Sequence, residues 1–312
     1  MSVYTELNRD DVLEILQGYA VGDLQGYEGI AAGIENSNFF VDTDLGRYVL
    51  TLFERMSEAE LPYFMRLMHD LSGKGFPCPA VQVRHDGELL FSYKGKQGCI
   101  VSCLPGRTLD RLTEVQLTSA GEMMARLHEA GKGFPEHRDD PTPLAWMRET
   151  ADMMRSDLSA RYGDEVARLL EDELAWQSSQ SQQNLPKGVI HADYFCDNIL
   201  FSGDEVTGVI DFYYASDGPW AYDLAIAVNA LACGPEEGDA TRIEALVSGY
   251  ERVRRLNDEE RQAWPGLLRL AALRFWVSRL YDALYPREGA MTQIKDPEEY
   301  RLKLLHWRQA HA

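Results

Sequence analysis

The chain has 312 residues, and 45% of them are hydrophobic, which is enough for one large globular domain or for two lobes with a sizeable core. Its formal net charge of −19 argues against a nucleic acid or an anionic membrane surface as partner, because both would repel an acidic protein. No apolar run approaches the ~20 residues of a membrane-spanning helix, and the first residues lack the basic and apolar regions of a secretory signal.

Five cysteines and seven histidines are scattered along the chain. The cysteines form no CxxC pair, so a zinc site has little support, and their odd number fits reduced thiols better than a disulfide framework. From these features we expect a cytoplasmic protein with no nucleic acid or membrane as partner. The sequence does not predict an oligomeric state.

The first third of the chain is expected to form a small sheet with two helices. Asn8 predicts the start of a helix from Arg9 to about Tyr19, and a capping box at Ser57 predicts another from about Glu58 to Ser72. Apolar runs bounded by turn residues predict a five-stranded antiparallel sheet. We place its strands in the Gly29–Val41 hairpin and in Arg47–Phe53, Ala80–Arg84, Glu88–Lys94 and Gly98–Leu104.

The Gly29–Val41 hairpin is expected to cover the phosphates of a nucleotide. Small residues around Gly33 let the backbone approach a phosphate closely. Asn36, Ser37 and Asn38 follow directly and could add hydrogen-bond donors. By itself this pattern is also typical of a simple hairpin. What favours the nucleotide is its position as the first hairpin of a chain that carries the kinase-like pattern at His191–Asn198.

The end of the sheet predicts a hinge between two lobes. The backbone of Ser102, Cys103 and Leu104 would hydrogen-bond an adenine ring there, with apolar side chains on both faces of the ring. We therefore divide the chain into an N-lobe at residues 1–104, which binds the nucleotide, and a C-lobe at residues 105–312, which carries catalysis and the acceptor substrate.

The strand Arg47–Phe53 lacks a residue that protein kinases carry. In those enzymes a lysine on this strand pairs with the nucleotide phosphates, and here Thr51 occupies its position. Arg55 is the nearest cation downstream. The sequence leaves open which residue fixes the phosphates instead.

Beyond the hinge the chain is predicted to be mainly helical. Thr113 with Gln116 forms a capping box that opens a helix, and residues 141–183 read as helical before they end in a polar loop. A further helix begins near Ala221, and helices continue to the end of the chain, with one over Trp264–Tyr285.

The stretch from His191 to Asn198 carries the clearest chemistry. It has the pattern H-x-D-x-x-x-x-N, and Asp211 follows after a predicted hairpin that turns at Gly203-Asp204. Transfer of a phosphoryl group to an alcohol needs a carboxylate that orients the hydroxyl and accepts its proton, a role we assign to Asp193. It also needs oxygen ligands for Mg²⁺, which Asn198 and Asp211 would supply. We interpret His191 as a structural brace of the loop.

Candidate substrate-binding residues follow the catalytic stretch. The loop after Asp211 is rich in aromatic and turn-forming residues where an acceptor would lie, and its candidates are Tyr213, Tyr214, Asp217 and Trp220. Further on, Arg274 and Arg279 stand among bulky apolar residues. Each of the two either extends its charged end to the surface or binds a substrate carboxylate bidentately.

The catalytic pattern, together with Tyr222-Asp223-Leu224-Ala225, resembles the aminoglycoside-phosphotransferase/choline-kinase superfamily. Three further stretches resemble more closely the bacterial homoserine kinases of that fold: Gly29–Phe40, Tyr48–Arg55 and Arg274–Arg279. The resemblance covers the whole chain. It implies an α+β, bilobal, protein-kinase-like fold with a five-stranded antiparallel N-lobe sheet and a largely helical C-lobe.

The resemblance also implies an activity. Homoserine kinases use ATP and Mg²⁺ to phosphorylate the hydroxyl of L-homoserine, a step toward threonine. Asp223 matches a residue that buttresses the catalytic loop in this superfamily, and Thr51 in place of lysine is shared by the homoserine kinases. One of the two arginines would take the substrate carboxylate, whereas Asp217 and the aromatic residues after Asp211 would take its ammonium group.

Alternatives remain open from the sequence. The acceptor could be another small alcohol, such as choline, ethanolamine, methylthioribose or an aminoglycoside, and an arginine that binds a carboxylate would argue against choline and the aminoglycosides. A non-catalytic nucleotide-binding protein is suggested by Thr51, although Asp193, Asn198 and Asp211 are all present. A protein kinase is disfavoured because no A-P-E sequence follows Asp211.

Overall fold

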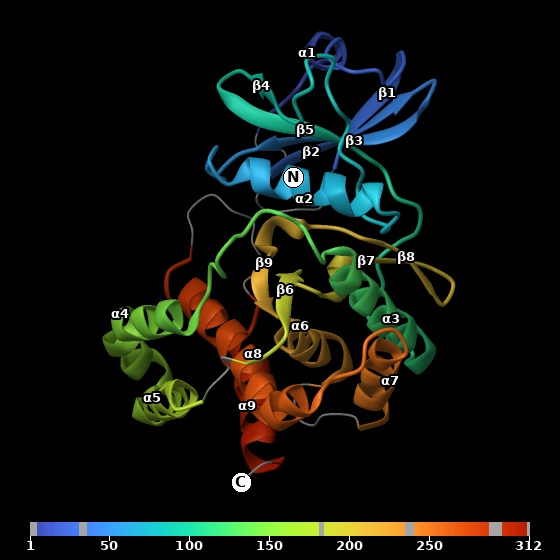
Figure 1. The fold of residues 1–312 in the computed structure, drawn as a ribbon. Coiled ribbons are helices and arrows are strands. Elements are labelled where there is room, and N and C mark those ends of the chain that lie inside the picture. The colour runs from blue at the N-terminus through green and yellow to red at the C-terminus, as the bar shows by residue number, and fades with distance from the viewer. Residues whose placement is uncertain (1–4, 31–35, 181–183, 235–239, 287–294, 311–312) are drawn as a thin grey trace. The chain divides into compact units, whose positions relative to one another are not determined.

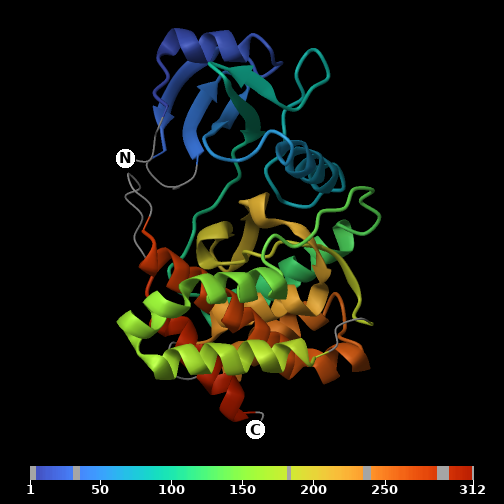
Figure 2. The ribbon, with the colours of Figure 1, turned by 90° about the vertical axis from the view of Figure 1, so that its left-hand side faces the viewer.

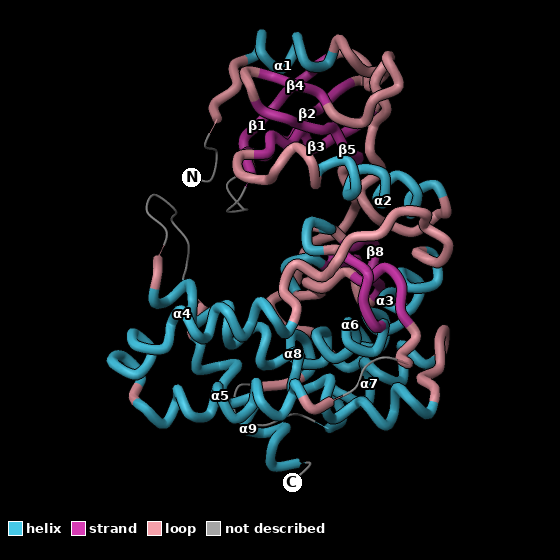
Figure 3. The backbone as a smooth tube through the Cα atoms, turned by 60° about the vertical axis from the view of Figure 1, so that its left-hand side comes forward, coloured by secondary structure: helices cyan, strands magenta, loops and turns pink. Residues whose placement is uncertain are grey.

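The computed structural model describes residues 5–30, 36–180, 184–234, 240–286 and 295–310. Its contacts divide the chain into two compact units. The first comprises the described residues up to Gly106 together with Thr207–Ile210, and the second comprises Arg107–Val206 and the described residues from Asp211 onward. The secondary structure differs between them, since the large sheet belongs to the first unit and most helices to the second (Figure 3).

The first unit is built on a five-stranded antiparallel sheet in the order β1-β2-β3-β5-β4 (Figure 1). Its strands are β1 (Leu24–Gly29), β2 (Asn36–Thr43), β3 (Gly46–Phe53), β4 (Phe91–Tyr93) and β5 (Lys96–Ser102). The predicted class and the predicted number of strands are confirmed.

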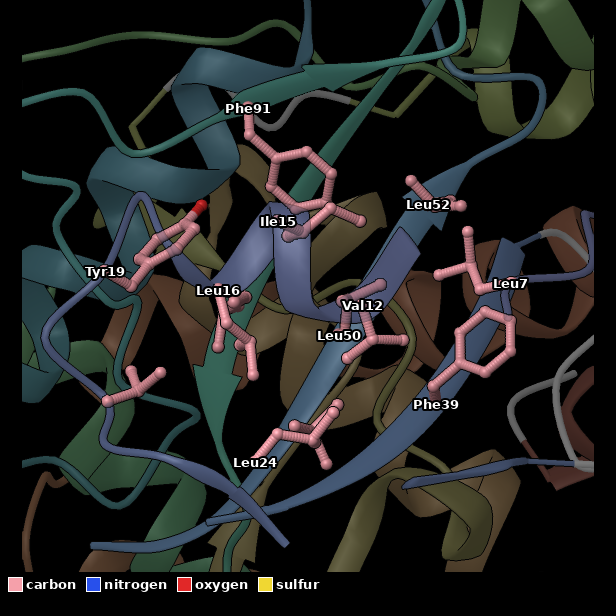
Figure 4. Packing of buried hydrophobic residues seen from close by; sticks show 13 residues of the cluster. Leu7, Val12, Ile15, Leu16, Tyr19, Leu24, Phe39, Leu50, Leu52 and Phe91 are labelled. Carbon is pink, nitrogen blue, oxygen red and sulfur yellow. The ribbon is translucent and has the colours of Figure 1, made fainter. Parts of the chain in front are cut away.

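One face of this sheet packs against the first helix, α1 (Arg9–Leu16). Asn8 caps the helix in a capping box with Asp11, as its sequence predicts. Val12, Ile15 and Leu16 of this region lie close to Leu50 and Leu52 of β3 in one buried cluster (Figure 4). Because successive residues of a strand point to opposite faces, Thr51 lies on the face away from α1.

Two N-terminal expectations differ from the structure. The second helix, α2 (Leu61–Gly73), begins three residues later than predicted because Glu60 is its N-cap and Pro62 lies in its first turn. Residues 80–84 form no strand in the described part of the chain. They follow Pro77 and Pro79, and they meet the sheet only through a single bridge between Val81 and Val101.

The second unit is largely helical. Its α-helices are α3 (Glu114–Ala130), α4 (Leu144–Tyr162), α5 (Asp164–Ser178), α6 (Trp220–Ala227), α7 (Ala240–Glu251), α8 (Asp258–Leu284) and α9 (Pro297–Ala310), and a π-helical turn, η3 (Val228–Ala232), follows α6. The predicted helical segment 141–183 is divided by Gly163, whose positive φ of 89° ends α4. The helices α4 and α5 then lie side by side (Figure 2).

Short strands frame the catalytic stretch. The strand β6 (Lys187–Ile190) precedes it and pairs antiparallel with β9 (Ser216–Pro219). The strands β7 (Ile199–Ser202) and β8 (Glu205–Val209) follow it as the predicted hairpin. The chain therefore enters and leaves the catalytic stretch through paired backbone, which holds the polar loop between fixed ends.

Two helices of the second unit approach each other through glycines. A Cβ atom on Gly121 of α3 would stand 2.0 Å from the carbonyl oxygen of Leu246 in α7, and one on Gly249 of α7 would stand 2.2 Å from the carbonyl oxygen of Thr118. Backbone thus lies directly against backbone. No helix of the described residues is long and apolar enough to cross a membrane.

Candidate active site

The catalytic loop, residues 191–198, is held together by its own polar groups. The amide nitrogen Nδ2 of Asn198 donates to the carbonyl oxygen of Asp193 at 2.8 Å and to its carboxylate Oδ2 at 3.1 Å. His191 is fully buried, and its Nδ1 lies 3.3 Å from the backbone nitrogen of Asp193. Two of the three predicted catalytic residues are therefore in direct contact, and His191 braces their loop as expected.

Asp223 of α6 holds the backbone of this loop through hydrogen bonds. Its two carboxylate oxygens accept hydrogen bonds at 2.8 Å from the backbone N–H groups of His191 and Ala192, and Oδ2 lies 3.0 Å from Nε2 of His128. Burial opposes ionisation of Asp223, but the hydrogen bond from His128 and the attraction of nearby positive charge together hold its pKa below the usual range. An ionised Asp223 thus accepts three hydrogen bonds and fixes the turn at Ala192, whose φ is 62°.

Asp211, the third predicted catalytic residue, stands at the end of β8. Its backbone is left-handed (φ 64°, ψ 65°), and it is exposed. A left-handed conformation is uncommon for a residue other than glycine and is frequent at functional sites. The next residue, Phe212, is fully buried and packs 4.9 Å from the His191 ring, which ties the backbone after Asp211 to the catalytic loop.

The donor atoms of the loop fit a hard divalent cation. The Asn198 amide nitrogen is engaged by Asp193, which leaves the amide oxygen as the atom for a metal, and Asp211 adds a carboxylate. Mg²⁺ prefers such oxygen ligands and usually completes its shell with water and substrate phosphates. The described residues contain no group of three His, Cys, Asp or Glu side chains that could hold a metal ion.

Arg274 of α8 is a cation that the fold brings to this loop. Its side chain is buried, and NH1 donates to the carbonyl oxygen of Ala192 at 2.5 Å. The guanidinium carbon lies 5.7 Å from the ring centre of Tyr214 and 4.5 Å from that of Phe275. Arg274 and Tyr214, both predicted to bind substrate, are thus near each other, and Arg274 contacts the residue before Asp193. The neighbouring candidate Tyr213 is half-buried in the same short helix, η2 (Phe212–Tyr214).

Arg279 has a different position on the same helix. Its NH1 group donates to Glu299 at 2.6 Å and to the carbonyl oxygen of Asp296 at 2.9 Å, and its guanidinium lies 4.4 Å over the Tyr300 ring. These contacts fasten α8 to the start of α9. The structure therefore does not bring Arg279 to the catalytic loop.

Asp217 and Trp220 have structural partners as well. Asp217 of β9 accepts hydrogen bonds from Nδ1 of His137 at 3.0 Å and from the backbone nitrogen of Arg138 at 3.2 Å. Trp220 stacks on His128 with ring centres 6.0 Å apart, and the Arg254 guanidinium lies 4.6 Å from its ring centre. None of these contacts joins either residue to Arg274, so their predicted role in substrate binding stays a prediction.

The predicted nucleotide residues of β2 point to both faces of the sheet. Ser37 is buried, donates to Glu54 at 2.6 Å and accepts from the backbone of Thr5, all on the face that carries α1. Asn38 lies opposite Thr51 on the other face and accepts its hydroxyl proton at 2.8 Å. Gly33 lies outside the described residues, and Asn36 begins β2. The position of the missing lysine is therefore filled by a Thr51–Asn38 pair.

Two of the backbone N–H groups of the predicted hinge already donate hydrogen bonds within the protein. The Ser102 N–H donates to the carbonyl oxygen of Ala80 at 2.9 Å, and the Cys103 N–H donates to that of Arg47 at 3.2 Å. Within the described chain, the Leu104 N–H donates to no backbone carbonyl. Leu104 is therefore the hinge residue best suited to offer its N–H to an adenine ring.

The sequence did not indicate two residues near the loop. His128 of α3 touches Asp223, and Lys295 lies 3.9 Å from Asp197 and 5.3 Å from the ring centre of Phe195. A single histidine on an apolar helix face and a single lysine carry no local signal. Only the fold brings them to the loop.

Comparison with known proteins agrees with this geometry. The phosphotransferase enzyme family matches residues 26–264. The chain belongs to this family. It is 43% identical to a homoserine kinase of Methylobacillus flagellatus over 98% of this chain and 95% of that protein, and 41% identical to one of Rhizobium meliloti over 97% and 94%.

A solved structure shows the same fold at low identity. The amicoumacin kinase hAmiN has a TM-score of 0.68 and 14% identity, and the match covers 97% of this chain and 92% of that one. The expected kinase-like fold is confirmed, and the chain is a phosphotransferase by family. The assignment of the H-x-D-x-x-x-x-N stretch to phosphoryl transfer is in keeping with this family.

Proposed function

We propose that the chain is a homoserine kinase, which transfers the γ-phosphoryl group of ATP to the hydroxyl of L-homoserine and releases O-phospho-L-homoserine, a step of threonine biosynthesis. Similarity to homoserine kinases over nearly the full length supports the activity. The structural observation that supports this acceptor best is the buried guanidinium of Arg274. It donates a hydrogen bond to the carbonyl oxygen of Ala192, the residue before Asp193 on the catalytic loop.

The chemistry of homoserine fits this arrangement. Its hydroxyl and carboxylate stand at the two ends of a short carbon chain, so a group that binds the carboxylate must lie close to the group that receives the hydroxyl proton. Arg274 meets this requirement. Its buried Nε atom makes no hydrogen bond of good geometry within the described residues, although the Tyr222 hydroxyl lies close to the guanidinium. A carboxylate would satisfy that donor. We therefore assign the carboxylate to Arg274 in preference to Arg279, which is paired with Glu299.

The proposed reaction is an in-line displacement without a covalent enzyme intermediate. Asp193 orients the hydroxyl and accepts its proton as the oxygen attacks phosphorus. Asn198 keeps the Asp193 carboxylate in place through its hydrogen bond and, with Asp211, offers oxygen ligands to the cation. Bound Mg²⁺ would neutralise charge on the phosphate oxygens. Tyr213 and Tyr214 would line the ammonium end of the substrate.

The nucleotide side of the proposal rests on the first unit. We keep the division into residues 1–104 for the nucleotide and 105–312 for the acceptor. Asn38 and Leu104 are the described residues whose positions favour a contact with ATP best, the first with phosphate and the second with adenine. All five cysteines are free, which supports the expected reducing, cytoplasmic setting.

A comparison of acceptors tests the proposal. ADP release would be measured with Mg²⁺-ATP and, in turn, L-homoserine, 3-amino-1-propanol, choline, ethanolamine, methylthioribose and kanamycin. 3-Amino-1-propanol is homoserine without its carboxylate, so it isolates the part assigned to Arg274. We expect turnover with homoserine far above that with all the others. Faster turnover of choline or kanamycin would contradict the acceptor, and ATP binding without any turnover would support a non-catalytic nucleotide-binding protein.

A further inference from the structure

A buried chain of polar side chains leads away from the catalytic loop. His128 of α3 bonds to Asp223 through Nε2 and, at 2.7 Å, to the hydroxyl of Tyr250 in α7 through Nδ1. NH1 of Arg254 lies 3.1 Å from the same hydroxyl, and NH2 donates to Glu260 at 2.7 Å. His128, Tyr250, Asp223 and Glu260 are all fully buried, so water cannot replace any of these partners.

The protons along this chain can be counted. A guanidinium is only a donor, so Arg254 gives a proton to the Tyr250 oxygen. The one proton of the Tyr250 hydroxyl is then left for Nδ1 of His128, its nearest partner at 2.7 Å. If Nδ1 accepts, Nε2 must carry the ring proton, and Nε2 faces the Asp223 carboxylate, which only accepts. With the ring proton of His128 on Nε2, every hydrogen bond of this chain has one donor and one acceptor.

The surroundings favour a neutral ring. Burial lowers the pKa of His128 below its ordinary value, the Asp223 carboxylate acts in the opposite direction, and the positive charge of Arg254 adds to the lowering. Trp220 stacks on His128 at an angle of 20° and carries the Arg254 guanidinium 4.6 Å from its ring centre. His128 is thus buried between Trp220 of α6 and Tyr250 of α7.

We propose that Tyr250 and Arg254 are positioning residues that hold the His128 ring, in its Nε2–H form, against Asp223 and so keep Asp223 in the orientation in which it supports the catalytic loop. Neither residue touches a substrate. The effect reaches Asp193 through the two backbone N–H groups that Asp223 receives from His191 and Ala192. This inference rests on the proposed function in one respect, which is that the kinetic test uses L-homoserine as the substrate.

Tyr250→Phe tests this proposal because it removes one oxygen and keeps the ring. Without the hydroxyl, Nδ1 of His128 is a buried acceptor without a donor, and the ring is held only by its bond to the Asp223 carboxylate, which still requires a proton on Nε2. ¹⁵N NMR of histidine-labelled protein should show the Nδ1 signal of His128 shift because its hydrogen bond is lost, and the amide signals of His191 and Ala192 should shift as well. We expect kcat with L-homoserine to fall about tenfold while both KM values stay within about twofold.

Tyr19→Phe is the matched control. The Tyr19 hydroxyl is buried in the cluster around α1 and has no hydrogen-bond partner within the described residues, so its removal should leave kcat and the His128 signal unchanged. If Tyr250→Phe fails to fold, the double variant Arg254→Gln with Glu260→Gln removes the charged donor to Tyr250 together with its counter-charge, and a shift of the Nδ1 signal in the same direction is expected.

Several results would overturn the proposal. They are an unchanged Nδ1 signal of His128 in Tyr250→Phe, a changed Nδ1 signal with unchanged kcat and unchanged loop amides, or an equal loss of kcat in Tyr19→Phe. The NMR readout needs no substrate. If the protein does not phosphorylate homoserine but Tyr250→Phe changes the Nδ1 signal and shifts the loop amides, the proposed function fails and the positioning role stands.

Discussion

Arg274 and Arg279 show how the surroundings of a residue decide its role. Both lie on α8 among apolar neighbours, and both are buried. Arg274 donates to the catalytic loop and keeps a buried Nε without a hydrogen bond of good geometry in the described residues, whereas Arg279 is paired with Glu299. A buried charge with an incomplete set of partners is the one that a ligand can complete.

The two arginines therefore predict different kinetics. Arg274→Lys removes the planar guanidinium fork and should raise KM for L-homoserine about 10- to 100-fold, because a hydrogen bond to a charged group contributes roughly 1.5–3 kcal/mol. KM for 3-amino-1-propanol, which has no carboxylate, should change much less. Steady-state assays with both acceptors measure this. Arg279→Lys is the matched control and should lower the unfolding temperature with little change in KM; the reverse pattern would contradict the assignment.

A second prediction concerns Asp11, whose carboxylate fastens α1 to the β4–β5 turn. Hydrogen bonds from Tyr93, from the Asn8 backbone and from Lys94 lower its pKa from 3.8 to about 2. A carboxyl whose pKa is lower in the folded state stabilises the fold above pH 3.8, and this contribution is lost as the pH falls toward 2.

Denaturant unfolding of the wild type and of Asp11→Asn across pH measures this contribution. The wild type should be the more stable at pH 5 to 7, and the two curves should converge as the pH approaches 2. A difference in stability that stays constant between pH 5 and pH 2 would show that ionisation of Asp11 does not carry the effect.

At the scale of elements, the glycine contact between α3 and α7 links packing to the catalytic loop. α3 carries His128 and α7 carries Tyr250, so the spacing of these helices sets the length of the polar chain beneath the loop. Gly121 makes that spacing possible because a side chain there would meet the Leu246 carbonyl at 2.0 Å and the Tyr250 nitrogen at 2.8 Å.

Gly121→Ala should accordingly destabilise the protein by about 1–3 kcal/mol, the usual cost of inserting a methyl group into closely packed backbone. Gly73→Ala is the matched control, since a Cβ atom at Gly73 would have nothing within 4 Å and no positive φ opposes it. Urea unfolding would measure both variants. Equal stabilities of Gly121→Ala and Gly73→Ala would contradict the close contact.

Element by element, the sequence predicts what local contacts determine. The capping boxes at Asn8 and Thr113 place helix starts correctly, because a cap is a contact between residues three apart. The predicted start of α2 is wrong by three residues, and the strand predicted at 80–84 does not form. Prolines lie next to both segments, and their effect depends on the contacts that the neighbouring backbone makes in the fold. The division of the segment 141–183 at Gly163 was also not predicted.

The site follows the same rule. Asp193 and Asn198 share one loop and are identified by their spacing alone. The contacts that define Arg279, Asp217 and Trp220 join residues between 20 and 92 positions apart in the sequence, and no local pattern indicates them. The sequence therefore predicts the catalytic residues. It does not predict the contacts that distinguish a substrate-binding residue from a structural one.

At the scale of the whole molecule, the charge of −19 makes local cations decisive. Both ATP and the carboxylate end of homoserine are anionic, and an acidic protein repels them at long range. Arg274 is a cation that the second unit holds on the catalytic loop. Lys295 is a second cation, and it lies beside Asp197 of the same loop. A net acidic enzyme can thus bind anionic substrates through a few fixed charges and a divalent cation.

The central claim is that Asp193 receives the proton of the homoserine hydroxyl during phosphoryl transfer from ATP. The most direct measurement is the formation of O-phospho-L-homoserine from Mg²⁺-ATP and L-homoserine by the wild type and by Asp193→Asn, with ATP binding measured in parallel by calorimetry. We predict that the wild type forms this product and that Asp193→Asn loses about 10²- to 10⁴-fold in kcat while it still binds ATP. A wild type that forms no phosphohomoserine, or a variant that forms it at an undiminished rate, would contradict the account.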